Sequence, residues 1–257
     1  FILKCIEAGK NILCEKPFVM NLVEAENIKK RLERSNIFFL EAIAYRTHPQ
    51  TKLILKLLRE NIIGNVIKIK SEFGFNAGVP KKNSRLFNKK LGGGSILDLG
   101  CYPITFSNLI ANYHQNEKEI IPKLREISGE IHELGIDLNA KAKLIYENSI
   151  TSDISVSINQ RFKNETEIFG SKGTIKILDP WLPKKKNIIE VKKDNKVEKI
   201  TSNAELEVFA NQINYFNLFV QNKNLKENYP AMSIDNSVNY MKVMTEWRDQ
   251  VLKNESK

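Results

Sequence analysis

The sequence is poor in cysteine. Its 257 residues include only 3 cysteines, Cys5, Cys14 and Cys101, and no two of them have CxxC spacing. An odd number of cysteines without that spacing argues against a disulfide framework and against a zinc site. We therefore expect no bound metal, and the unpaired thiols indicate a reducing, cytoplasmic compartment.

Long apolar runs are also missing. A membrane-spanning helix requires about 18 consecutive apolar residues, and the candidate run 62–69 is interrupted by Gly64, Asn65 and Lys68. The chain begins with Phe1, and no charged segment precedes an apolar one there, so this beginning does not resemble a signal peptide. We expect no association with a membrane.

Acidic residues are outnumbered by basic ones. The sequence has 40 Lys and Arg against 30 Asp and Glu, for a net charge of +10, which raises the question of nucleic-acid binding. Phosphate binding requires that the basic residues cluster, but local basic runs occur only at 81–90 and 184–186. Without a nucleic-acid-binding motif or aromatic residues between the lysines, a solvated surface is the better interpretation. We expect no nucleic-acid partner.

The first 48 residues alternate between helix and strand patterns. Apolar stretches at 11–14 and 37–44 indicate strands, and the second is apolar enough to be buried on both faces. The segment 1–8 resembles a helix that ends at a glycine, and helical spacing over 22–34 follows a capping box. This order predicts the second half of a Rossmann-type, doubly wound α/β sheet over residues 1–48.

After residue 48 the pattern changes. A helical pattern is followed by alternation of apolar and polar residues, which is typical of strands with one wet face. We expect helices at 50–61, 94–112, 205–222 and 233–253, and strands at 67–75, 137–147, 151–160 and 165–178. Residues 49–257 are therefore predicted to form an α+β domain with a large open mixed or antiparallel sheet. Its last helix is expected to return to the first domain.

Glu15, Lys16 and Pro17 follow the first predicted strand directly. Ligands of open α/β sheets bind just beyond the carboxyl ends of the strands, so a lysine at this point can stabilise negative charge on a substrate oxygen. The alternative is a plain surface turn, and these three residues do not decide between the two.

Asp98 and Tyr102 follow three consecutive glycines, 92–94. Residues four apart share one face of a helix, and glycines before a helix allow the backbone to approach a ligand closely. An aspartate and a tyrosine on an otherwise apolar helix indicate a site, because burial without partners is costly. The alternative is a core helix in which the tyrosine is hydrogen-bonded inside the protein.

Four motifs occur together in one order: Glu15-Lys16-Pro17, the segment from Glu41 to Gln50 with Tyr45, Arg46 and His48, the segment from Gly92 to Tyr102, and Ile168-Phe-Gly-Ser-Lys-Gly-Thr-Ile175. In this order and spacing the chain resembles the Gfo/Idh/MocA oxidoreductases over nearly its whole length. It looks most similar to the branch with glucose-fructose oxidoreductase, D-xylose dehydrogenase and dihydrodiol dehydrogenase, whose members have a tyrosine at the position of Tyr102.

The resemblance implies an NAD- or NADP-dependent dehydrogenase acting on a secondary alcohol of a sugar, polyol or diol. Lys16, Asp98 and Tyr102 are then the catalytic residues, with Tyr102 as general acid/base and Asp98 orienting substrate and lysine. The cofactor is expected to bind at Glu15, Lys16, Pro17 and Arg46, and the substrate at His48 and Asp98. The peptide between Lys16 and Pro17 is often cis in this family.

One departure from the family is plain. The sequence contains no GxGxxG, so the first half of the dinucleotide-binding domain, which separates NAD from NADP, is expected upstream of Phe1. Without it, we expect the chain alone to bind the cofactor weakly and to be inactive.

Two other functions remain open at this point. The chain can belong to a non-catalytic, ligand-binding member of the same fold, or to a sugar-exchange or glycosidase enzyme that keeps its nicotinamide tightly bound. The basic loop 80–90, which includes Lys81, Lys82 and Arg85, is a candidate for selecting a phosphorylated or acidic sugar. We also expect a homodimer or homotetramer formed through the open sheet, since an uncovered apolar sheet face is a liability in a monomer.

Overall fold

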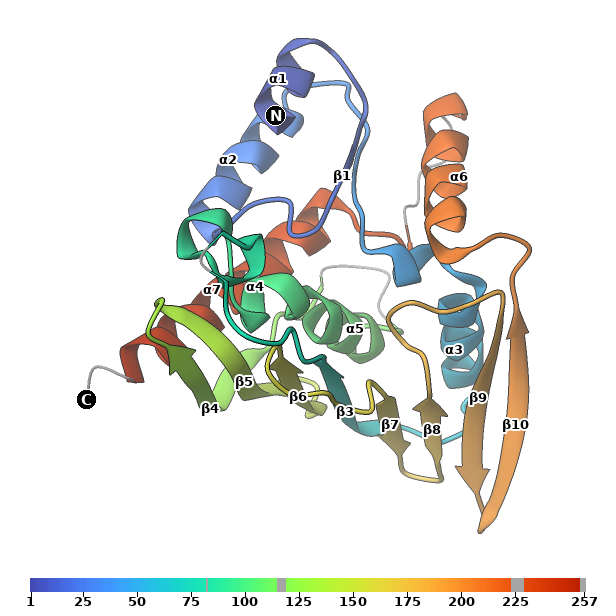
Figure 1. The fold of residues 1–257 in the computed structure, drawn as a ribbon. Helices are drawn as coiled ribbons and strands as arrows, with labels where there is room; N and C mark the ends of the chain where they lie inside the picture. The colour runs from blue at the N-terminus through green and yellow to red at the C-terminus, as the bar shows by residue number, and fades with distance from the viewer. Residues whose placement is uncertain (82, 115–118, 223–228, 255–257) are drawn as a thin grey trace.

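The fold of the chain is seen in a computed structural model that describes residues 1–81, 83–114, 119–222 and 229–254. Within these residues the strands form one sheet of two strands and one of eight (Figure 1). Lys82, which belongs to the basic loop singled out above, lies outside the described residues.

The small sheet comes first in the chain and is parallel. Its elements are α1 (Ile2–Glu7), β1 (Ile12–Cys14), α2 (Leu22–Leu32) and β2 (Phe39–Glu41). Asn21 caps α2 by accepting a hydrogen bond from the backbone N–H of Glu24, as the capping pattern predicts. Cys14 lies beside Glu41 in the strand register. The segments that follow the two strands therefore leave the sheet at the same edge.

The large sheet is mixed. Its strands are β3 (Val66–Gly74), β4 (Lys123–His132), β5 (Ile136–Ile145), β6 (Thr151–Ser157), β7 (Thr166–Gly170), β8 (Thr174–Ile177), β9 (Lys186–Lys193) and β10 (Lys196–Asn203). They are arranged in the order β10-β9-β8-β7-β3-β6-β5-β4. Only β3 and β6 pair in parallel, and the other neighbours are antiparallel.

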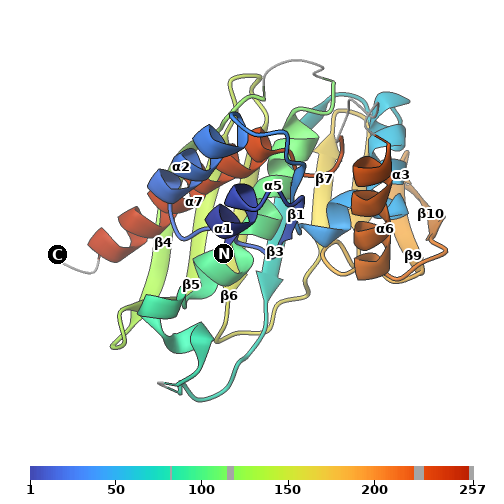
Figure 2. The ribbon, with the colours of Figure 1, turned by 90° about the horizontal axis from the view of Figure 1, so that it is seen from above.

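Helices cover one face of this sheet (Figures 1 and 2). The helical elements after β2 are η1 (Ala44–Thr47), α3 (Pro49–Arg59), η2 (Arg85–Phe87), η3 (Lys89–Leu91), α4 (Ser95–Leu99), α5 (Cys101–Ala111), α6 (Val208–Gln221) and α7 (Ile234–Asn254). Under α4 and α5, strand residues such as Ile69, Leu144 and Val156 are fully buried. Alternation sends the next side chains to the opposite face, where Lys68 pairs with Asp153 at 2.6 Å.

The last helix of the chain lies against the first part of the chain. The backbone N–H of Leu22 donates to the Thr245 hydroxyl at 3.0 Å, and the Lys29 ammonium is 2.5 Å from the Asp235 carboxylate. Ser233 caps α7 by accepting from the N–H of Asn236, as its position in the sequence predicts. Helix α7 thus joins the small sheet to the large one. No helix within the described ranges is long and apolar enough to cross a membrane.

Three strands, β4, β9 and β10, were not predicted. β4 and β10 are the two edge strands, and most of their residues are exposed, so selection for an apolar face is weak and the alternation is lost. The turn between β9 and β10 did carry a signal. Asp194 and Asn195 both have positive φ, 49° and 59°, as a two-residue hairpin turn requires.

The helix predicted over 94–112 is two helices, α4 and α5, separated at Gly100. The reason is Pro103, which has no N–H to donate to the carbonyl of Leu99 and so interrupts the helical ladder. Asp98 and Tyr102 therefore stand on different helices. Gly100 between the two helices nevertheless keeps helical dihedral angles, φ −60° and ψ −28°, so the two residues still lie about one helical turn apart.

Candidate active site

Lys16, Asp98 and Tyr102 meet between the small sheet and the helices of the large one. The Lys16 ammonium donates to the backbone carbonyl of Asp98 at 2.6 Å and lies 3.6 Å from the Asp98 carboxylate. It also stands 5.0 Å from the centre of the Tyr102 ring, within the range of a cation–π contact. The Lys16–Pro17 peptide is cis. The structure thus brings together the three residues expected to be catalytic.

A second cation shares the carboxylate of Asp98. The guanidinium of Arg85, from the loop before α4, lies 2.7 Å from Asp98 Oδ1. The side chains of Lys16 and Asp98 are only 17% and 12% exposed, so these charges are weakly screened by salt. The Arg85 side chain is 56% exposed, and the carboxylate of Glu15 also acts on Tyr102, so the shielded Lys16 ammonium is the group that can stabilise an oxyanion at this point.

Aromatic rings surround Tyr102. Phe73, on β3, meets it edge to face with ring centres 5.0 Å apart, and Trp181 and Tyr45 lie at 5.9 Å and 6.4 Å. Burial raises the pKa of the Tyr102 hydroxyl, and the Cys101 thiol and the Asp98 carboxylate raise it further. The phenol therefore keeps its proton at neutral pH, and loss of that proton depends on a cation at the site.

The turn that carries Asp98 is held by a buried aspartate. Asp137, on β5, accepts from the Ser95 hydroxyl and from the backbone N–H of Ile96, both at 2.6 Å. Gly94 has φ of 112°, and a Cβ at this position would stand 2.4 Å from Asp137 Oδ1. This glycine is thus required by both its backbone conformation and the close approach of the cap.

The other expected site residues are placed differently. Glu15 is exposed at the end of β1, next to Lys16. Arg46 is buried, and its guanidinium donates to the backbone carbonyls of Thr105 and Pro230. His48 is fully buried, and its Nδ1 accepts from the backbone N–H of Gln50 at the start of α3. Both residues therefore hold elements of the fold together, and among the described contacts none joins either of them directly to Lys16.

Phe73 and Trp181 were not expected at the site, and Arg85 was expected only as part of a basic loop. Phe73 looked like one more apolar residue of an alternating strand. Trp181 lies in the sequence Asp-Pro-Trp-Leu-Pro, and a tryptophan in a proline-rich turn was the available signal. Its indole N–H donates to the carbonyl of Glu72 at 2.9 Å, which fixes the ring beside Tyr102.

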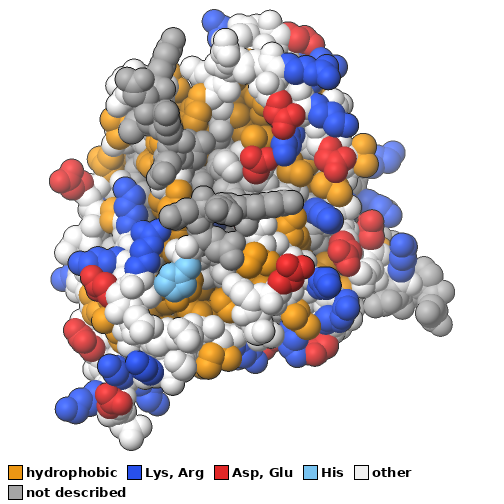
Figure 3. All heavy atoms as spheres, turned by 180° about the vertical axis from the view of Figure 1, so that it is seen from behind, with side chains coloured by type: hydrophobic (Ala, Val, Ile, Leu, Met, Phe, Trp, Pro, Cys, Tyr) orange, Lys and Arg blue, Asp and Glu red, His pale blue; other side chains and the backbone are white. Residues whose placement is uncertain are grey.

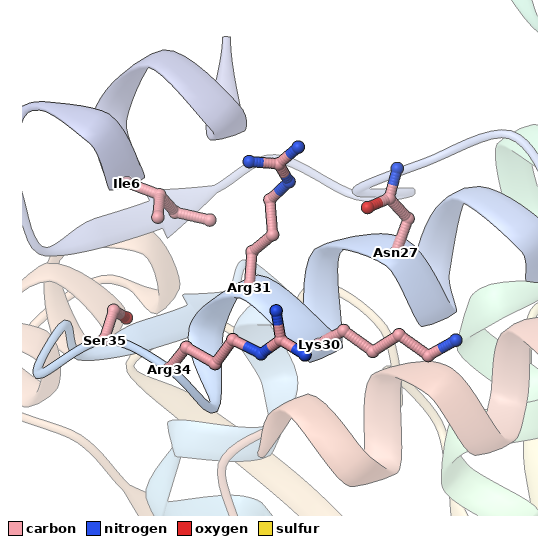
Figure 4. A pocket seen from close by; sticks show the side chains of 6 residues that line it. All are labelled: Ile6, Asn27, Lys30, Arg31, Arg34 and Ser35. Carbon is pink, nitrogen blue, oxygen red and sulfur yellow. The ribbon is translucent and has the colours of Figure 1, made fainter.

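A separate hollow of about 500 Å³ lies between α1 and α2 (Figure 4). Lys30, Arg31 and Arg34 line it, and all three are exposed. Lys30 and Arg31 stand in the last turn of α2, where positive charge interacts favourably with the helix dipole, and Arg34 follows the end of the helix. On the face drawn in Figure 3, basic and acidic side chains are intermixed. Among the described residues no group of three His, Cys, Asp or Glu side chains is arranged to hold a metal.

The chain combines a small parallel sheet, followed by Lys16 at the end of β1, with a large mixed sheet covered by the helices that carry Asp98 and Tyr102, and known proteins share this arrangement. The GFO/IDH/MocA C-terminal domain family matches residues 51–176. The chain belongs to the Gfo/Idh/MocA family, which confirms the resemblance seen in the sequence.

Among individual proteins, trans-1,2-dihydrobenzene-1,2-diol dehydrogenase of Xenopus tropicalis is 34% identical over 183 residues, which cover 71% of this chain and 53% of that protein. The human enzyme of the same name is 28% identical over 184 residues, covering 71% and 52%. The chain therefore spans about half the length of the curated relatives that it matches.

Solved structures show the same fold. KijD10, a 3-ketoreductase from Actinomadura kijaniata in complex with NADP and TDP-benzene, superposes with a TM-score of 0.81 at 19% identity, covering 95% of this chain and 71% of that one. Aldose-aldose oxidoreductase from Caulobacter crescentus superposes with a TM-score of 0.83 at 18% identity, covering 99% and 73%. The predicted fold class, half of a Rossmann-type sheet followed by a large open-sheet α+β domain, is confirmed.

Proposed function

We propose that the chain forms the catalytic part of an NAD(P)-dependent oxidoreductase acting on a secondary alcohol of a sugar, polyol or diol. The observation that supports this is the Lys16 ammonium, bonded to the Asp98 carbonyl and placed over the Tyr102 ring. The dihydrodiol dehydrogenases are named for a diol substrate, and KijD10 was crystallised with NADP. The free thiols of the chain fit a cytoplasmic enzyme.

The residues at the edge of the small sheet fit the nicotinamide end of a dinucleotide. Lys16 and Pro17 follow the carboxyl end of β1, where open α/β sheets bind ligands. Glu15 and the aromatic wall of Phe73 and Trp181 border the same place. A nicotinamide dinucleotide, when bound, supplies the hydride acceptor, and its pyrophosphate needs a glycine fingerprint that this sequence does not contain.

The protein side chains then divide the remaining work. Lys16 stabilises negative charge on the alcohol oxygen as that oxygen becomes a carbonyl. Tyr102 accepts the hydroxyl proton once its own proton has left to solvent, a loss that the Lys16 ammonium, 5.0 Å from the ring centre, favours and that burial opposes. Asp98 holds Lys16 through its backbone carbonyl, while Arg85 neutralises its carboxylate. Water is excluded by the buried rings around Tyr102.

Replacement of Lys16 tests this function most directly. In a protein that carries the whole dinucleotide-binding domain, Lys16→Ala should slow hydride transfer by roughly 10²–10³, the usual cost of losing one oxyanion stabiliser. Lys16→Arg should also fail, because a planar guanidinium does not replace a compact ammonium. Single-turnover transfer is followed by the absorbance of the reduced cofactor.

The outcome separates the alternatives. Normal transfer by Lys16→Ala would contradict the role of the lysine. No transfer by the unaltered protein, with any sugar or diol, would favour a non-catalytic binding protein. A nicotinamide that stays bound through purification and is not exchanged would instead indicate the sugar-exchange or glycosidase alternative.

A further inference from the structure

A buried carboxyl group lies behind Lys16. Glu41, the last residue of β2, is 1% exposed and sits beside Cys14 in the register of the small sheet. Its Oε2 is buried and makes no well-aligned hydrogen bond within the described residues, and the Ser237 hydroxyl on α7 lies close enough to lower the pKa of the carboxyl group. An isolated buried carboxylate is costly, so a glutamate at this position needs a reason other than packing.

The other oxygen of Glu41 joins three elements. Glu41 Oε1 accepts from the backbone N–H of Phe18 at 3.1 Å and also from the hydroxyl of Tyr240 on α7. Phe18 follows Lys16 by two residues, across Pro17. Proline has no N–H, so the amide of Phe18 is the first backbone donor after Lys16. This amide donates its hydrogen bond to Glu41.

The charges around Glu41 are few. The titratable groups that interact with it among the described residues include the thiol of Cys14 on β1, the ammonium of Lys16, the thiol of Cys101 on α5 and the phenol of Tyr240 on α7. Burial raises the pKa of Glu41 to about 7, and hydrogen bonds and the charge of Lys16 act in the opposite direction. Among these groups Lys16 is the one cation.

We propose that Glu41 is a positioning residue for Lys16: its side chain holds the backbone after Lys16 and links it to α7, so that the ammonium stays on Asp98 and over Tyr102. The inference rests on the proposed role of Lys16 in turnover, and it assigns Glu41 an indirect part in the reaction. Loss of the acceptor should release the Phe18 amide and let the ammonium leave the Asp98 carbonyl.

Three substitutions of Glu41 separate the acceptor from the charge. Glu41→Gln keeps an oxygen that accepts from both donors, Glu41→Ala removes it and leaves a cavity, and Glu41→Leu removes it with little change of volume. The first measurement is the rate at which an amine-reactive acylating reagent modifies Lys16. Mass spectrometry of this chain gives that rate. We expect about a tenfold faster reaction in the Ala and Leu variants and no change in the Gln variant, since local opening follows loss of the bond.

Two lysines serve as internal controls. Lys176, which is 28% exposed and pairs with Glu165 on the large sheet, reports general loosening of the fold and should react as before. Lys56 is 67% exposed, so its rate of modification shows whether the reagent is equally active in every sample. If the Ala variant fails to fold, Lys176 will also react faster. The modification rate of Lys16 in the Leu variant then tests the proposal.

The second measurement is turnover in a protein with the whole dinucleotide-binding domain. The Ala and Leu variants should lose about tenfold or more in kcat, with little change in KM for the cofactor, because misplacement of a catalytic group slows chemistry. Equal labelling of Lys16 in all four proteins would overturn the proposal. Faster labelling with unchanged kcat would uphold the positioning of Lys16 and overturn its proposed role in catalysis instead.

Discussion

For single residues at the site, burial is the main cause of the shifted pKa of Tyr102. Tyr102 is a phenol whose pKa is raised by the aromatic wall and by Asp98. Its usefulness as an acid/base therefore depends on the Lys16 ammonium, 5.0 Å from the ring centre. The two residues should act as a unit, so that losing either costs nearly as much as losing both.

Tyr102→Phe tests the proton transfer at this site. The substitution keeps the ring against Phe73 and removes only the hydroxyl, so the fold should be retained. In a protein with the whole dinucleotide-binding domain, we expect turnover to fall by roughly 10²–10⁴, with little loss of cofactor affinity. Steady-state kinetics give the turnover, and a fluorescence titration gives the affinity. Unchanged turnover would remove Tyr102 from the mechanism.

The pH dependence of stability should reveal Glu41. Its pKa is raised from 4.5 to about 7 in the folded chain, so between these values the folded state holds a proton that the unfolded state has lost. The free energy of unfolding should therefore fall as pH rises from about 4.5 to about 7, by about 3 kcal/mol. Below and above this window Glu41 contributes no slope.

Urea unfolding at several pH values measures this effect. The difference between the unaltered chain and Glu41→Gln isolates it, because other groups contribute equally to both. A pH-independent difference over that window would contradict a neutral, buried Glu41.

At the scale of elements, the short helix α4 depends on groups distant in the sequence. Asp137 on β5 supplies its cap, and Gly94 makes room for that cap. A residue 42 positions away thus decides where the turn carrying Asp98 begins. The glycines suggested that some close approach occurs here, but they did not identify the partner.

Gly94→Ala tests this arrangement against a matched control. At Gly94 a methyl group meets both an unfavourable φ of 112° and Asp137 Oδ1 at 2.4 Å. At Gly78 φ is 74° and no atom lies within 4 Å of the added Cβ. We expect Gly78→Ala to cost about 1 kcal/mol from backbone strain alone, and Gly94→Ala roughly 2–4 kcal/mol. Equal costs, measured by urea unfolding, would mean that the Asp137 contact is unimportant.

At the scale of the whole molecule, the two faces of the large sheet differ. The argument for assembly assumed that part of the apolar face is uncovered, but α4 and α5 bury Ile69, Leu144 and Val156. The opposite face has ion pairs such as Lys68 with Asp153 together with exposed Ile145 and Ile188, which are 37% and 39% exposed. The uncovered apolar surface is therefore formed by these exposed isoleucines on the opposite face, and not by the face under α4 and α5.

The expectation of a homodimer or homotetramer therefore stands for that opposite face. Its ion pairs, such as Lys68 with Asp153, form within one chain, and a net charge of +10 makes copies repel at low salt. Light scattering of the full-length protein at micromolar concentration should show an assembly at low ionic strength that persists near 1 M salt, because salt screens this repulsion. A monomer under both conditions would contradict the prediction.

The fold class follows from the sequence alone, and the motifs around Lys16, Asp98 and Tyr102 pointed to a site through their resemblance to a known family. Buried strands at 11–14 and 37–44, alternating strands after residue 66, and the positions of Lys16, Asp98 and Tyr102 were accessible because periodicity and motif spacing are local properties. Edge strands such as β10 were not, since exposed strands lack the apolar alternation that reveals the others.

Only the tertiary structure decided which partners these residues have. Lys16 meets the carbonyl of Asp98 across 82 positions of chain, and Glu41 receives the Phe18 amide and the Tyr240 hydroxyl from elements that are far apart in sequence. Arg46 and His48 are buried and hydrogen-bonded to the backbone, and their expected roles at the site stay predictions. Burial and hydrogen-bond partners depend on long-range packing. Because these two set the pKa of a side chain and decide whether it belongs to a site or to the core, neither property can be read from local sequence.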